Sequence, residues 1–298
     1  MFDLLGTIKE KTGLSGIGDT LASPKSVQNV FDIKAVYPDG IFCVGKDKWS
    51  VTLKFTDINY AVSSKADKEQ YFFKYSDLLN SLENEVSTQI TIINRRINND
   101  ELERITLNEK NGDGNDKYRR EINDMLLSYA NNAGTIVQDK YITLTVTKRT
   151  YEEARTALRT MCTNIKQHFT RVGSKCSELE LSERMRIIHD FCRPGEESDF
   201  HFDLNDTLKK GHSFKDYISP DGFSFEKDHF IVGNKYARVL FLRDYPSYIK
   251  DSVIWEMTDS ARNMIFNYDI VPISTEEAIK FVEKQALGVE TNISATRS

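Results

Sequence analysis

One stretch of the sequence, residues 41–55, limits the possible folds more than any other. Between Trp49 and Phe55 every second residue is apolar and those between are Ser, Thr and Lys, the period of a β-strand with one buried face. Residues 41–45 are suited to a second strand, and the run of Gly, Lys, Asp and Lys between the two strands favours a hairpin. The Pro-Asp-Gly at 38–40 predicts a turn before it, since Pro presets one backbone angle and Gly accepts a positive one.

Three amphipathic helices are expected after this hairpin. The first opens at Ser64 with a capping-box pattern, and its expected inner face is Phe72, Tyr75, Leu79 and Leu82. The second spans 116–129, with Tyr118, Ile122, Met125 and Tyr129 in phase. The third begins after Thr150, and its expected inner face is Ala154, Leu158, Met161, Ile165 and Phe169. Between the helices, strands are expected at 86–93 and 141–146, the first with Thr88, Ile90 and Ile92 on one side.

The second half of the chain repeats part of this order. A Pro-Asp-Gly turn recurs at 220–222, and the elements expected after it are strands at 230–233, 236–242 and 264–271, with helices at 249–262 and from Ser274 to Leu287. In 236–242 Arg238 interrupts one face of the alternation, but Ala237, Val239 and Phe241 make the other face apolar, so we expect that strand to be buried on both sides. We interpret the shared order as a weak internal repeat. The predicted fold class is α+β, with mixed sheets, crossover helices and two related split βαβ-like units.

These patterns divide the chain into four regions. Residues 1–30 contain several Gly, Ser and Pro residues and are expected to form a flexible arm. Residues 31–180 are the first unit, and 181–220 are a connector with a helix at 181–191 and an irregular acidic remainder. Residues 221–298 are the second unit, and we interpret 293–298 as the end of a truncated polypeptide.

Composition and charge exclude several classes of protein. A chain of 298 residues with 39% hydrophobic residues can bury a core without disulfides or metals, and its 15 Gly and 6 Pro exclude collagen and global disorder. No apolar run approaches the roughly 20 residues that cross a bilayer. The net charge of -5 argues against a strong nucleic-acid partner. None of the four cysteines forms a CxxC pair, so we interpret them as reduced thiols of a cytosolic protein.

Two motifs come close to known ligand sites. Residues 40–46 have the GxxxxGK spacing of a phosphate-binding loop, but Asp47 replaces the Ser or Thr that binds magnesium, and a strand follows in place of a helix. We therefore predict a hairpin without nucleotide. Residues 111–116 resemble the start of a calcium loop, but Asp116 and Ile122 occupy the positions that require Gly and Glu. A solvated turn that caps the next helix is the preferred interpretation.

The stretch from His189 to Asp206 gathers groups that could serve a metal or acid–base chemistry. Its candidates are His189, Asp190, Cys192, Glu196, Glu197, Asp199, His201, Asp203 and Asp206. Zinc sites favour pairs such as CxxC or HExxH, and neither is present, so an acidic surface loop is the default interpretation. No GxSxG elbow exists, and nothing in the sequence marks Cys162, Cys176 or His168 as activated. We assign no catalytic, cofactor-binding or metal-binding residue.

Basic residues occur in pairs, at Arg95-Arg96, Arg119-Arg120 and Lys148-Arg149, within charged neighbourhoods typical of solvated faces. Single-stranded DNA binding would require exposed aromatic side chains between Lys and Arg. The only candidates are Tyr141 beside Lys140, and Tyr151 after Lys148-Arg149.

Several short motifs together resemble a known family. They are Ala35-Val36-Tyr37-Pro38-Asp39-Gly40-Ile41-Phe42, Phe55-Thr56-Asp57-Ile58-Asn59-Tyr60, Tyr75-Ser76-Asp77-Leu78-Leu79-Asn80, Phe200-His201-Phe202-Asp203, Phe214-Lys215-Asp216-Tyr217-Ile218 and Leu287-Gly288-Val289-Glu290-Thr291-Asn292. As a set, spanning about 27–292, they resemble the N-terminal domain of the TrbE/CagE/TraE-like conjugation ATPases, the fourth VirB component of type IV secretion systems, in the form found in Gram-positive conjugative elements.

This resemblance implies an α/β domain that precedes a RecA-like ATPase domain with Walker motifs, often in hexamers at the cytoplasmic face of the membrane. The present chain contains neither Walker motif, so no catalytic residue carries over. The expected role is docking and assembly, with inner-membrane channel subunits and other copies of the ATPase as partners. The alternatives are a contact module for single-stranded DNA and a hydrolase that uses the cluster from His189 to Asp206.

Overall fold

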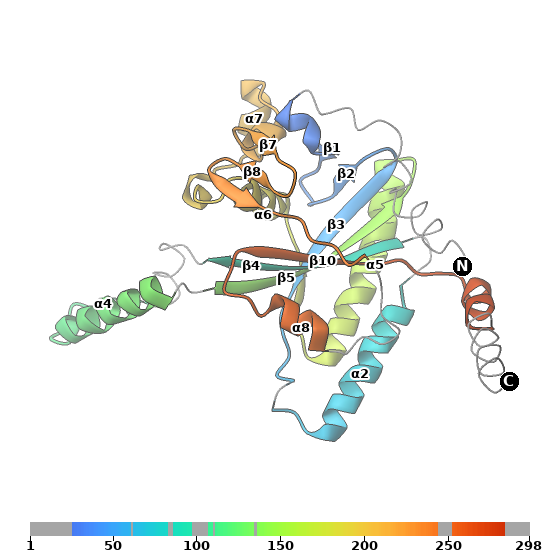
Figure 1. Cartoon of the computed structure of the whole chain (residues 1–298), viewed down its shortest axis with the longest axis horizontal. Helices are drawn as coiled ribbons and strands as arrows, with labels where there is room; N and C mark the ends of the chain where they lie inside the picture. The colour runs from blue at the N-terminus through green and yellow to red at the C-terminus, as the bar shows by residue number, and fades with distance from the viewer. Residues whose placement is uncertain are drawn as a thin grey trace.

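The computed structural model describes residues 26–60, 62–82, 86–96, 107–109, 111–133, 136–243 and 252–283. Their strands form a seven-stranded sheet and a separate three-stranded sheet, with helices around them (Figure 1). The predicted α+β class is confirmed. Every described strand pair in both sheets is antiparallel. The prediction of mixed sheets, which contain parallel pairs as well, is therefore wrong for the described strands.

The bounds of the elements are as follows. The large sheet contains β1 (Ile33–Val36), β2 (Phe42–Val44), β3 (Lys48–Phe55), β4 (Val86–Arg96), β5 (Ile136–Thr147), β6 (Cys176–Glu178) and β10 (Met264–Ile270). The small sheet contains β7 (Phe223–Phe225), β8 (Phe230–Val232) and β9 (Lys235–Ala237). The α-helices are α2 (Lys65–Asn80), α4 (Asp116–Ala133), α5 (Tyr151–Val172), α6 (Leu181–Cys192), α7 (Leu204–Lys210) and α8 (Ser252–Thr258), and residues 275–283 are also helical. The 3-10 helices are η2 (Val27–Val30), η3 (Glu197–Asp199) and η4 (Phe214–Tyr217).

The centre of the large sheet has the topology of two interleaved split βαβ units. The sheet order is β1-β2-β3-β5-β4-β10, with β6 also paired to β3. Helix α2 connects β3 to β4 across β5, and α5 connects β5 to β6 across β3. Six elements in the order βαββαβ with this interleaving make a ferredoxin-like arrangement. The split βαβ prediction is therefore confirmed for the first unit.

Local signals in the sequence explain where these elements begin and which face they bury. Ser64 caps α2 by accepting a hydrogen bond from the amide of Asp67, and Thr150 caps α5 by accepting one from Glu153. The alternating residues of β3 and the stripe on α5 meet in one core, which includes Val51, Leu53, Ile142, Leu144, Leu158 and Ile165. On α5 the expected Ala154, Leu158, Ile165 and Phe169 are buried, but the fifth buried residue is Cys162 and the expected Met161 is only partly buried.

The connector covers the second face of the sheet, which the sequence did not predict. Leu181 and Met185 of α6 form a second core with Ile33, Phe42 and Ile218, and Phe200, Phe202 and Phe214 pack against it. Arg184 of α6 is buried and donates to the carbonyl oxygens of Gly40 (2.6 Å) and Ser50 (2.8 Å). Residues 193–221 include α7 and two 3-10 helices, so the expected irregular loop is partly helical and partly packed.

The expected second unit, 221–298, does not form one unit, because its described strands are divided between the small sheet (β7, β8 and β9) and the large sheet (β10). The hairpin of β8 and β9 exists, but β10 pairs with β4 in the large sheet over seven residues in unbroken register. A related second unit would have placed β10 beside β8 and β9. The expected strand 236–242 ends at Ala237, and Val239, Leu240 and Phe241 are more than 70% exposed and not buried on both sides. No described strand pairs with residues 238–243.

The inner face of α2 also differs from the expected one. Leu78 is its buried residue, whereas Phe72 and Tyr75 are 60% and 41% exposed. Of the expected arm 1–30, residues 1–25 lie outside the described residues, whereas 27–30 form the 3-10 helix η2. Residues 249–251 and 284–287 of the last helices, the motif at 287–292 and the chain end at 293–298 also lie outside the described residues.

Candidate functional site

Helix α4 is the element that stands apart from the sheet. It belongs to the connection between β4 and β5 and extends beyond their ends, with no other labelled helix or strand beside it (Figure 1). The sequence predicts this helix from its apolar period, and the helix is confirmed. Because no described helix or strand lies beside it to stabilise it by packing, the helix depends more on local support at its ends.

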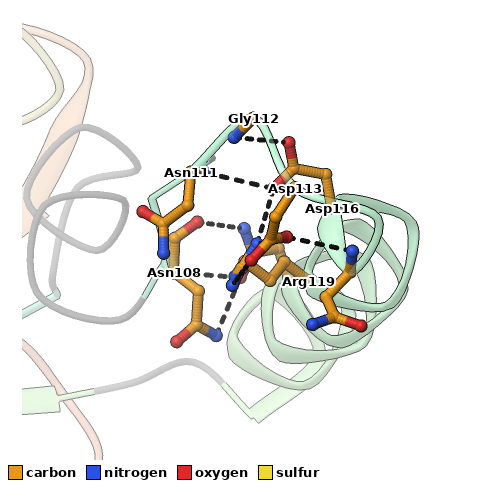
Figure 2. Close-up of polar contacts among 8 residues, drawn as sticks. Asn108, Asn111, Gly112, Asp113, Asp116 and Arg119 are labelled. Atoms are coloured by element: carbon orange, nitrogen blue, oxygen red, sulfur yellow. Dashed lines mark hydrogen bonds and ion pairs between the residues drawn. The ribbon is translucent and has the colours of Figure 1, made fainter.

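That support comes from the turn before the helix, shown in Figure 2. The carboxylate of Asp116 accepts hydrogen bonds from the amides of Asn111 (3.1 Å) and Gly112 (3.0 Å). The guanidinium of Arg119 donates to Asp116 (2.7 Å) and to both oxygens of Asp113. One helical turn later, Asn123 is hydrogen-bonded to the main chain of Asn108. Negative charge at a helix N-terminus also favours the helix dipole.

The charges of this turn stabilise one another. The hydrogen bond from Arg119 lowers the pKa of Asp113 and of Asp116, and their main-chain amide donors lower it further. The two carboxylates raise the pKa of Arg119 in return. Since these oxygens already accept hydrogen bonds, the turn caps the helix as the sequence predicts. Among the described residues, no group of three His, Cys, Asp or Glu side chains is placed to hold a metal ion.

The apolar face of α4 is exposed. Tyr118, Ile122 and Met125 are 62%, 45% and 51% exposed, and their spacing of i, i+4 and i+7 puts them on one side of the helix. Neighbouring exposed apolar side chains indicate an interaction site, whereas single exposed apolar residues are common on any protein surface. A side-chain stripe at this spacing is also what a helix presents when it binds in a groove of a partner. We call Tyr118, Ile122 and Met125 the α4 stripe.

The GxxxxGK segment is a strand between two turns. Gly40 and Gly45 have positive φ angles of 77° and 88°, and β2 lies between them. Asp47 also has a positive φ, and β3 begins at Lys48. A phosphate loop leads into a helix whose N-terminal amides bind the phosphates, and no helix follows here. The hairpin interpretation is confirmed.

The cluster from His189 to Asp206 is dispersed by the fold. His189 is buried with its ring 4.9 Å from that of Phe200, and Cys192 is buried too. His201 is exposed, whereas Asp203 accepts a hydrogen bond from the amide of Asp206 at the start of α7. The Nδ1 atom of the buried His189 lies 3.1 Å from a carboxylate oxygen of its neighbour Asp190. Among the described residues of this stretch, no three of these side chains are placed to hold a metal ion.

A cleft of about 830 Å³ lies between the turn after α6 and the small sheet. Its wall includes Arg193, whose guanidinium binds Glu196 (2.9 Å) and Asp221 (2.8 Å). Several Gly and Pro residues, at 194–195, 220, 222 and 233, form much of the rest. The residues that line the cleft come from 192–196 and 220–235. These two ranges are separate in the sequence and share no motif, so the cleft could not be predicted.

The candidate DNA-contact residues are already engaged. Tyr141 is buried, and Lys140 forms an ion pair with Asp57. The ring of Tyr151 stacks on Tyr37 with centres 4.0 Å apart, and its hydroxyl donates to Asp39. Neither tyrosine offers a free face for base stacking, which single-strand binding requires.

The cysteines show no activation. Burial raises the pKa of Cys162 and of Cys192 to about 12, and that of Cys176 to about 11. A nucleophilic thiol needs a lowered pKa. His168 is half-buried near the end of α5.

Comparison with known proteins gives no match, neither to the profile of a known family nor to a curated protein. No helix in the described part of the chain is both long and apolar enough to cross a bilayer.

Proposed function

We propose that the chain is the docking and assembly domain of a type IV secretion ATPase of the conjugative-element kind. In this role it binds inner-membrane channel subunits at the cytoplasmic face of the membrane. The nucleotide chemistry belongs to the P-loop ATPase domain of such proteins. The observation on which the proposal rests is the α4 stripe, because its three apolar side chains are exposed on a helix that projects from the sheet.

The residues behind the family resemblance support the proposal through their structural roles. Asp39 of the Tyr-Pro-Asp-Gly turn accepts hydrogen bonds from Tyr151 and Arg155 and so joins the turn to α5. Phe200, Phe202 and Phe214 pack against the second core. These motif residues stabilise the part of the fold from which α4 projects. Such a structural role is expected of motifs that family members have in common.

The partner we propose for the α4 stripe is a cytosolic segment of a channel subunit with an apolar groove. Burying a large apolar side chain is worth roughly 1.5–3 kcal/mol, so three anchors supply a useful share of the binding energy. The polar network at the start of α4 holds the helix in advance, which reduces the ordering cost of binding.

The test is a binding titration between the purified chain and the cytosolic segments of the channel subunits encoded beside it. Ile122→Asp places a charge in the α4 stripe and should weaken binding about 30-fold or more. Arg120→Asp introduces the same side chain about 200° around the helix and should leave binding unchanged. Circular dichroism checks that both variants keep α4. Equal affinity for all three proteins would contradict the proposal.

A further inference from the structure

The two outer strands of the large sheet differ in how well they are protected from pairing. At one edge, β1 has four residues, a register shift between Ile33 and Ala35, and a lysine at position 34. Short length, bulges and lysine are the devices that natural edge strands use against pairing with another chain. At the other edge, β10 has seven residues, unbroken register, no Lys, no Pro and one acidic residue, Asp269. No described strand pairs with its outer side.

We propose that the unprotected edge of β10 pairs with β10 of a second copy of this chain, antiparallel and centred on Asn267. Two large sheets then join into one continuous sheet across a two-fold axis. This contact is separate from the α4 stripe and does not depend on the proposed function.

The sequence of β10 fits this register residue by residue. A two-fold pairing centred on Asn267 is the one antiparallel register that overlaps all seven residues. On the helix-covered face it places Phe266 opposite the partner's Tyr268, a favourable aromatic pair, and Met264 opposite the partner's Ile270. On the opposite face Ile265 lies opposite the partner's Asp269, and Asn267 opposite its own copy. No like charges meet.

Contacts of β10 with β4 and with the main core already position several of these side chains in the single chain. Asn267 accepts a 2.7 Å hydrogen bond from Thr91, and Asp269 accepts a 2.9 Å bond from Gln89, both across the strand pair with β4. On the other face Tyr268 and Ile270 pack against the main core. The edge is therefore regular and two of its side chains are already ordered, which lowers the entropy cost of adding a strand.

Cysteine cross-linking of the full chain reads the register directly, in a background where Cys43 and Cys176 are replaced by Ser. Directly opposed residues have Cα atoms about 4.5–5.5 Å apart, within disulfide range. Oxidised Asn267→Cys should therefore give a covalent dimer. Ile265→Cys or Asp269→Cys alone should not, because each then lies about 13 Å from its own copy. A mixture of these two variants should cross-link.

Sedimentation gives an independent measurement of the same contact. The wild-type chain should form a reversible dimer, and Asn267→Lys, which sets two ammonium groups opposite each other, should raise the dissociation constant about tenfold or more. Asn267→Ser is the matched control and should keep the wild-type constant. A chain that sediments as a monomer throughout the micromolar range would overturn the proposal. Equal cross-linking of all three single cysteine variants would overturn the register.

Discussion

Arg184 of α6 donates a 2.6 Å hydrogen bond to the main-chain oxygen of Gly40, in the turn that leads into β2. The same guanidinium lies 3.9 Å from the centre of the Phe42 ring and also donates to Ser50 of β3. Burial lowers the pKa of Arg184 to about 9, which leaves it charged at neutral pH. The Arg184 side chain thus joins the connector to the turn at Gly40 and to β3. We call this set of contacts the Gly40 junction.

Replacing Gly40 should damage this junction. Its φ of +77° is unfavourable for other residues, and an added Cβ would lie 2.2 Å from the carbonyl oxygen of Leu179. Gly40→Ala should therefore reduce the free energy of unfolding by at least about 2 kcal/mol. Gly173→Ala is the control, because Gly173 has a φ of +91° but open space around its Cβ. Urea denaturation should show a clearly smaller loss for Gly173→Ala, and equal losses would contradict the junction.

Asp139 should make stability depend on pH in the acid range. Burial alone would raise the pKa of Asp139, but hydrogen bonds and charge from Lys54 (2.6 Å) and Arg95 (2.8 Å) outweigh burial and lower it below its ordinary value. The folded state therefore binds this proton less readily than the unfolded state. The resulting stabilisation is present above about pH 4 and is lost as the pH falls through the folded-state pKa.

The variant Asp139→Asn isolates this contribution. At neutral pH it should be about 1–3 kcal/mol less stable than wild type, since Lys54 and Arg95 then share one neutral acceptor oxygen in place of a carboxylate. Denaturation at a series of pH values should show a constant difference down to about pH 5 and a narrowing below it. A difference that stays constant in strong acid would show that Asp139 acts through packing and not through its charge.

The chain should neither bind nor hydrolyse ATP by itself. The GxxxxGK segment is a hairpin, and Asp47 would place a carboxylate beside a phosphate. Calorimetric titration with magnesium-ATP should give no binding heat, and Lys46→Ala should behave like wild type. Micromolar binding that is lost in Lys46→Ala would contradict this.

Binding to single-stranded DNA should be weak and should disappear near physiological salt. The net charge is -5, and the tyrosines beside the basic pairs are buried or stacked. Binding that rests on scattered cations falls steeply with salt. Fluorescence anisotropy with a labelled oligonucleotide measures this. Submicromolar binding at physiological salt, reduced by changing Lys148 and Arg149, would instead support the DNA-contact role.

Local features of the fold could be predicted from the sequence because they depend on neighbouring residues. The position of β3, the caps at Ser64 and Thr150 and the burial of Thr88, Ile90 and Ile92 are of this kind. The single buried face predicted for β3 is wrong, because Ser50 and Thr52 are buried as well. The partner of β10 could not be predicted, because alternation tells which face of a strand is buried and not which strand lies beside it. β10 pairs with a strand almost 180 residues earlier, and the repeat pattern suggested a nearer one.

The candidate site was predicted only in part for a related reason. The period of Tyr118, Ile122 and Met125 predicts a helix with an apolar face. The same period occurs whether that face packs against the core of the chain or is exposed for binding another protein. Only the structure shows that α4 projects from the sheet. In the connector, Phe200 and Phe202 stand among acidic residues, so composition indicated a surface loop, whereas both rings are partly buried against the second core.

The most direct test of the proposed docking role is photocross-linking in donor cells that carry the whole transfer apparatus. A photoreactive amino acid at Met125 reports what contacts the α4 stripe, and one at Arg120 reports on the opposite side of the same helix. We predict a cross-link from position 125 to an inner-membrane channel subunit and none to it from position 120. Absence of that product from position 125, or equal yields from both positions, would contradict the account.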